Sequence, residues 1–158
     1  MDDNKSLLIH PFAFAIFPVL FLYSHNVREI LLKWTVVPAA VILIFTLLLF
    51  VILSYLSGNK DKAGLLVSLL LVYFFAYGHF VGTFRGLAGG WNQAHLWLLP
   101  AWTVGFLVPG WLVLRTGIRL VNTTKILNVV AVCLVGFSLI NIVWFETRSL
   151  ILRQDTDV

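Results

Sequence analysis

Charged residues are scarce in this 158-residue chain: they make up 11% of it, whereas hydrophobic residues make up 60% and the mean hydropathy is +0.96. This balance excludes an ordinary soluble domain and indicates an integral membrane protein. The formal net charge of +4 comes from Lys and Arg residues that are scattered over every loop, so we expect no nucleic-acid partner. The single cysteine, Cys133, excludes an intramolecular disulfide, and its apolar neighbours argue against a nucleophile there.

Long runs without charge predict the fold. Each run of about 20 apolar residues satisfies its own backbone hydrogen bonds as a helix of roughly 30 Å, the thickness of the hydrocarbon core. We predict an all-α, polytopic integral membrane protein that forms a single membrane domain over residues 1–158. Its five transmembrane helices are expected at about residues 8–24, 35–56, 63–84, 95–114 and 126–145, followed by a tail at 146–158 outside the cytoplasm.

The central run, residues 63–84, becomes aromatic and polar only in its second half. Gly78, Gly82 and Gly86 repeat there at a spacing that permits close helix approach, and internal packing is favoured over a dimer interface. No charged residue falls in the middle of a span, which argues against an ion or proton pathway.

Prolines and asparagines mark the other spans. Pro18 should kink the first span, and Pro100 and Pro109 should make the fourth the most irregular. Asn128 and Asn141, inside the fifth, are expected to form hydrogen bonds between helices.

Loop charge sets the expected orientation, although the margin is thin. Five Lys or Arg residues fall on one side (Arg28, Lys33, Arg85, Arg148 and Arg153) and six on the other (Lys5, Lys60, Lys62, Arg115, Arg119 and Lys125). We expect the amino terminus in the cytoplasm and the carboxyl terminus outside, in the inner (plasma) membrane of a prokaryote.

This orientation places several amphipathic side chains near the outer face. The candidate interaction cluster is Tyr23, His25, Asn26, Tyr77, His79 and His95. Its three histidines allow a metal or proton-relay reading, because imidazole is the commonest metal ligand. No nearby Asp, Glu or Cys completes a coordination shell, so we predict no metal or other cofactor and favour interfacial packing or contact with a lipid headgroup.

Two segments suggest a family. LLIHPFAFAIFPVLFLYSHN, then a second span and DKAGLLVSLLLVYFFAYGHF, resemble the amino-terminal membrane region in front of some sulfatase-like proteins of the alkaline-phosphatase superfamily. The resemblance covers residues 8–84, and it implies an extracytoplasmic hydrolase or transferase domain after the helices. This sequence ends at Val158, where that domain would begin, so no catalytic position is carried over.

The sequence therefore predicts a membrane anchor or interaction module without catalytic activity of its own. Its partners would be the lipid bilayer and a sulfatase-like or phosphoglycerol-transferase-like domain, or that domain's lipid substrate. A small transporter or channel subunit is the alternative, because a proline-broken fourth helix could line a cavity. An intramembrane enzyme acting through His25 or His79 ranks last, since no complete acid, base and nucleophile set is present.

Overall fold

A computed structural model describes the backbone of residues 7–27, 29–118 and 120–156, and the side chains of this part as far as Arg148. The described chain folds into helices joined by short links, without strands, and this confirms the all-α class. The helices are α1 (His10–His25), α2 (Lys33–Ser57), α3 (Lys60–Ala88), α4 (Trp91–Arg115) and α5 (Val121–Thr156).

The turns between helices follow from local backbone chemistry. Gly58 ends α2 in the left-handed region, at φ 61°, where a residue without a Cβ carries little strain. Asn59 then caps α3, because its side chain accepts a hydrogen bond from the backbone N–H of Lys62. Gly89 ends α3 in the same left-handed way, at φ 81°.

Helices α1 to α4 begin and end within four residues of the predicted spans, whereas α5 ends eleven residues later than predicted, at 156 instead of 145. α1 has 16 residues, about 24 Å, and is shorter than the four helices that are long and apolar enough to cross a membrane. α5 does not stop at residue 145 but continues to Thr156, so the expected tail is helical over residues 146–156.

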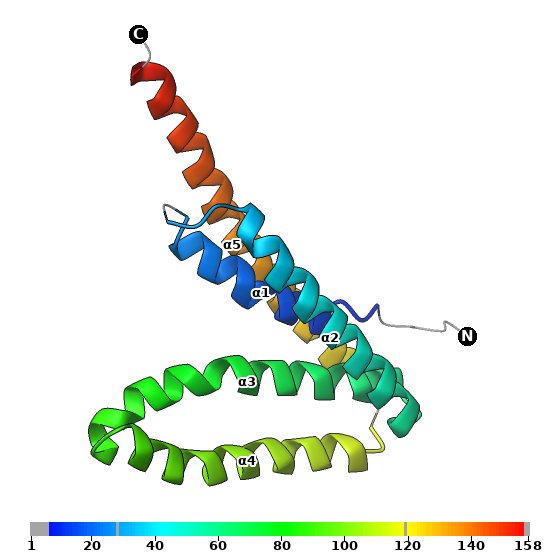
Figure 1. Cartoon of the computed structure of the whole chain (residues 1–158). Coiled ribbons are helices and arrows are strands. Elements are labelled where there is room, and N and C mark those ends of the chain that lie inside the picture. The colour runs from blue at the N-terminus through cyan, green and yellow to red at the C-terminus, as the bar shows by residue number, and fades with distance from the viewer. Residues whose placement is uncertain (1–6, 28, 119, 157–158) are drawn as a thin grey trace.

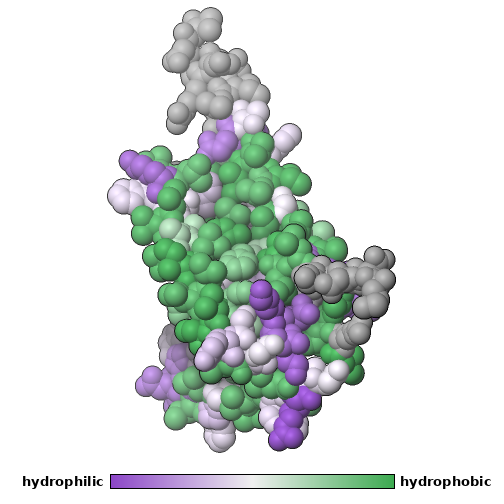
Figure 2. Space-filling model, turned by 90° about the vertical axis from the view of Figure 1, so that its right-hand side faces the viewer, coloured by the Kyte–Doolittle hydropathy of each residue, from purple (hydrophilic) through white to green (hydrophobic). Residues whose placement is uncertain are grey.

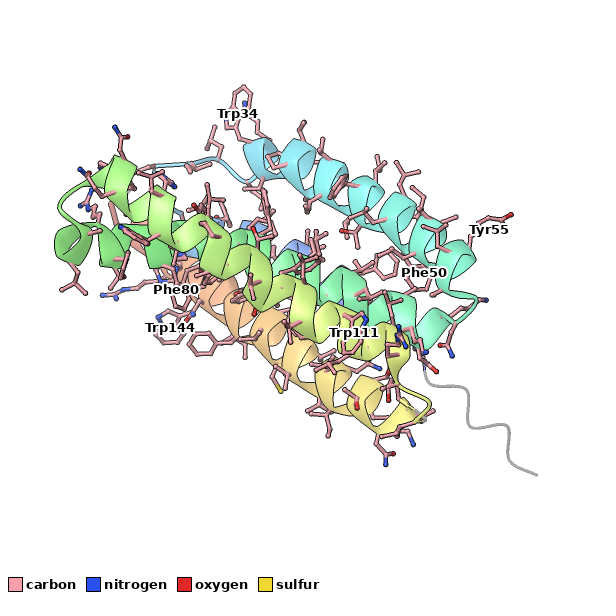
Figure 3. All side chains as sticks on the ribbon, turned by 90° about the horizontal axis from the view of Figure 1, so that it is seen from below. Trp34, Phe50, Tyr55, Phe80, Trp111 and Trp144 are labelled. Carbon is pink, nitrogen blue, oxygen red and sulfur yellow. The ribbon has the colours of Figure 1, made fainter. Side chains whose placement is uncertain are left out.

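Aromatic side chains near helix ends have the spacing that two membrane interfaces would require. Trp34 and Tyr55 project outward from opposite ends of α2 (Figure 3), and 21 residues of helix separate them by about 32 Å. That distance matches the hydrocarbon thickness, and Trp and Tyr favour both interfaces. On α4, Trp91 and Trp111 lie a similar distance apart.

The helices form two groups that meet at one end. α1 packs against α5, α2 and α3, while α4 packs on α3. Figure 1 shows the α3–α4 hairpin diverging from α1, α2 and α5 toward the link at residues 88–91. We call that end the open end, and the opposite end, with the start of α1 and the links at residues 57–60 and 115–121, the closed end.

Small and aliphatic side chains fill the core near α1. Ala13 and Ala15 allow α1 to approach its neighbours closely, and they pack with Val67, Leu71 and Ala131. The outer surface is mostly apolar, as Figure 2 shows in a view onto the closed end, where hydrophilic residues gather in the lower half. The exposed apolar surface suits contact with lipid.

Candidate functional site

All six residues of the predicted interaction cluster lie at the open end, but they form two separate groups. Tyr23, His25 and Asn26 end α1, and the other three lie on the α3–α4 hairpin. No hydrogen bond or ring contact joins a residue of one group to a residue of the other within the described chain. The reason is the divergence of the hairpin from α1 (Figure 1).

At the α1 group, a tyrosine holds two helices together. Tyr23 is 2% exposed, and its hydroxyl donates a hydrogen bond of 2.9 Å to Oε1 of Glu146 on α5. We call this the Tyr23–Glu146 pair. The sequence places Glu146 in the expected tail, and its position directly after the last apolar run is the one local sign of this contact.

The other two residues of this group bond to their own helix. The Asn26 side-chain amide donates to the Leu22 carbonyl at 2.8 Å, and Nδ1 of His25 lies 3.0 Å from the Phe21 carbonyl oxygen. These bonds satisfy carbonyls at the end of α1. His25 is exposed, and its second ring nitrogen, Nε2, forms no hydrogen bond among the described residues.

The hairpin group is built on a second tyrosine. The hydroxyl of Tyr77 lies 2.8 Å from Nδ1 of His95, whose ring stacks on Trp91. Arg85 lies over the Trp91 ring at 4.7 Å, a cation–π contact near the link between the helices. His79 is exposed, and its imidazole has no partner among the described residues.

Further along the hairpin, side chains compensate for a proline. Pro109 has no N–H, so the Gly105 carbonyl loses its helical partner. The Tyr73 hydroxyl donates to that carbonyl at 2.8 Å, while Nε1 of Trp102 donates to the Tyr73 carbonyl at 3.0 Å. α4 is therefore a continuous helix from Trp91 to Arg115 despite Pro100 and Pro109, and the expected interruption is absent.

The glycine positions differ from the prediction as well. A Cβ at Gly78, Gly82 or Gly86 would meet nothing within 4 Å, so these residues do not mediate helix packing within the described chain. Gly64 does: a Cβ there would lie 2.9 Å from Cδ2 of Leu8 and 3.4 Å from the His10 ring. The close approach between α1 and α3 lies at the closed end.

Hydrogen bonds between helices gather at this closed end, and the one between His10 and Ser68 is buried. His10 is 0% exposed, and its Nδ1 lies 2.6 Å from the Ser68 hydroxyl oxygen on α3. Oδ1 of Asn128 on α5 accepts from the backbone N–H of His10 at 2.8 Å and of Ile9 at 3.1 Å. Its Nδ2 donates to the Leu7 carbonyl at 2.6 Å.

Asn128 thus caps α1 from another helix, satisfying N–H groups that a helix start leaves without partners. This confirms the prediction for Asn128, although its partners are backbone groups. Asn141 is exposed and forms no hydrogen bond in the described chain, so the same prediction for Asn141 is wrong.

The His10–Ser68 contact resembles a base beside a nucleophile, but its surroundings do not suit catalysis. His10 is 0% and Ser68 3% exposed, so no substrate reaches either side chain in this conformation. Nε2 of His10 is buried without a hydrogen-bond partner and packs against Gly64. The arrangement fastens α1 to α3.

The acidic, cysteine and histidine side chains do not converge. Within the described ranges, no group of three or more of them could hold a metal ion.

No protein-family model, no curated protein and no solved structure matches this chain significantly. The resemblance to sulfatase-like membrane regions therefore stays a prediction.

Proposed function

We propose that this chain is a non-catalytic membrane anchor and interaction module that holds a partner at the open end. The observation that carries the proposal is the length of α5. Its 36 residues span about 54 Å, whereas the hydrocarbon core is roughly 30 Å thick. Figure 1 shows the end of α5 reaching beyond the other helices, where a stiff extension can orient a partner.

The Tyr23–Glu146 pair supports the same proposal. It ties α1 to α5 at Glu146, the first charged residue after the uncharged run of residues 126–145. A buried tyrosine at this point limits the swing of the extension relative to α1. The exposed His25 ring next to it offers a partner a donor or an acceptor.

The orientation is part of the proposal. The six-to-five charge count favours the closed end in the cytoplasm and the open end outside the plasma membrane of a prokaryote. The resemblance suggests a sulfatase-like or phosphoglycerol-transferase-like domain, or its lipid substrate, as the partner. The transporter alternative was based on an interrupted fourth helix, and the continuity of α4 removes that basis.

Co-purification of a tagged full-length chain with a co-expressed sulfatase-like extracytoplasmic domain tests the proposed partner. The double variant His25→Leu with Glu146→Leu should reduce the retained domain severalfold, because it removes the exposed imidazole and the acceptor of the Tyr23 hydroxyl beside the α5 extension. The variant His79→Leu is the matched control, since it changes an exposed histidine at the same end on the hairpin. Equal retention by all three proteins would refute the proposal.

Orientation is measured separately, with a membrane-impermeant maleimide applied to whole cells. In a chain with Cys133→Ala, the variant Gln93→Cys at the open end should be labelled and Asn59→Cys at the closed end should not. Labelling of Asn59→Cys alone would reverse the assigned orientation.

A further inference from the structure

A groove lined by apolar side chains opens on the side of the bundle between α1, α2 and α5. Its volume is about 400 Å³. Ile9, which directly precedes α1, and Ile16 on α1 line it, together with Leu43 from α2 and Val132, Gly136 and Leu139 from α5. A Cβ at Gly136 would meet nothing within 4 Å, so the missing side chain there leaves room in the groove.

The size of the groove limits its occupant. From Val132 to Leu139 it follows α5 for seven residues, about 10 Å. A helix segment of that length and 10 Å across occupies roughly 800 Å³, about twice the volume available. A hydrocarbon chain is narrower and needs no hydrogen bonds, so it suits a groove without polar lining.

A lysine lies on the same face of α5. Lys125 precedes Val132 by seven residues and Leu139 by fourteen, which are intervals of about two and four helical turns. It is exposed and lies about 10 Å from Val132 toward the closed end. The first turn of α5 contains no acidic residue. No carboxylate therefore offsets the positive end of the helix dipole, and the dipole and Lys125 both favour an anion near this end of α5.

The surroundings at the closed end favour an anion. Among the described residues, this end carries four basic side chains, Lys60, Lys62, Arg115 and Lys125, and one acidic side chain, Asp61. Lys62 already has a hydrogen-bond partner, because its Nζ donates to the Leu114 carbonyl at 2.7 Å. Lys125 therefore combines an exposed cation with the helix face that lines the groove.

We propose that this groove binds one acyl chain of a bilayer lipid whose anionic phosphate headgroup is bound by Lys125. The apolar groove selects the chain, and the lysine selects the headgroup charge. The site is distinct from the open end, so its presence or absence does not depend on the proposed function.

Photolabelling of the full-length chain in phosphatidylcholine vesicles tests the site. Two probes carry a diazirine in an acyl chain, one as phosphatidylglycerol and the other as phosphatidylcholine, and peptide mass spectrometry locates the label. The phosphatidylglycerol probe should label the groove-lining parts of α1 and α5 in preference to the phosphatidylcholine probe. Lys125→Gln should lower the ratio of phosphatidylglycerol to phosphatidylcholine labelling about fivefold, because one lysine near a membrane surface contributes about 1 kcal/mol to binding an anionic lipid.

Matched variants separate this site from general contact with lipid. Lys60→Gln removes a lysine at the same end away from the groove and should leave labelling unchanged. Gly136→Leu should reduce groove labelling by both probes, whereas Gly82→Leu, on an open face of α3, should not. Leu139→Trp obstructs the groove from a second position, in case Gly136→Leu does not fold. Equal labelling by the two probes, or equal loss with Lys60→Gln and Lys125→Gln, would overturn the proposal.

Discussion

The two ends of the bundle are held together differently. At the closed end, the His10–Ser68 contact joins the α3–α4 hairpin to the other helices, and Asn128 caps the start of α1. At the open end, the Tyr23–Glu146 and Tyr77–His95 bonds each stay within one group of helices. The comparison indicates that the closed end maintains the fold, and exposed polar groups at the open end are what the proposed function requires.

The largest loss of stability is expected from Asn128→Leu. It leaves the N–H of His10 and of Ile9 and the Leu7 carbonyl without their partner, at a cost of about 2–3 kcal/mol in the free energy of unfolding. Reversible unfolding in mixed detergent micelles measures the change. Asn141→Leu is the control in the same helix, and it should change stability by less than about 0.5 kcal/mol. Equal losses for both variants would remove the distinction between the bonded and the exposed asparagine.

A smaller effect is expected where α1 approaches α3. A methyl group at Gly64 would lie 2.9 Å from Cδ2 of Leu8, the end of a flexible side chain that must turn away, so Gly64→Ala should destabilise the protein by about 1 kcal/mol relative to Gly82→Ala. Gly82→Ala meets nothing within 4 Å, and it should be neutral or stabilise helix α3 by a few tenths of a kcal/mol. Thermal unfolding of the two variants gives the comparison, and a lower Tm for Gly82→Ala than for Gly64→Ala would contradict it.

Within the hairpin, Tyr73→Phe should cost about 1 kcal/mol, because the Gly105 carbonyl loses its hydrogen bond. In the background of Pro109→Ala, the backbone N–H of residue 109 can bond to that carbonyl, so the cost of Tyr73→Phe should fall. A double-mutant cycle from unfolding free energies measures this coupling. Additive effects of the two substitutions would show that the tyrosine does not compensate for the proline.

The smallest effect is expected at the exposed open-end histidine. His79→Ala should change the free energy of unfolding by less than about 0.5 kcal/mol, because the imidazole has no partner in the described chain. The same micelle unfolding assay measures it, and a loss as large as that of Asn128→Leu would contradict the proposed difference between the ends.

The sequence predicts the helices well because hydrophobic runs and turn residues act locally. The turn at residues 57–60 follows from Gly58 and Asn59 alone. The continuation of α5 past residue 145 was missed because its polar residues resemble a tail, yet no Pro or Gly follows Gly136 to end the helix.

The contacts between helices were harder to predict. His10 and Ser68 are 58 residues apart, and Asn128 and His10 are 118 apart, so nothing local in the sequence pairs them. The spacing of Gly78 and Gly82 indicates that another helix could approach α3 closely there, but it does not show that a neighbouring helix lies against that face. The two groups at the open end follow from the divergence of the hairpin, which depends on packing throughout the bundle.

Cysteine cross-linking at both ends tests most directly whether the two groups of helices meet at only one end. In a chain with Cys133→Ala, one variant carries Leu8→Cys with Gly64→Cys at the closed end, and the other carries His25→Cys with His79→Cys at the open end. Under mild oxidation in vesicles, we predict a disulfide in the closed-end pair and none in the open-end pair. A disulfide at comparable yield in the open-end pair would contradict it, because His25 and His79 would then lie together.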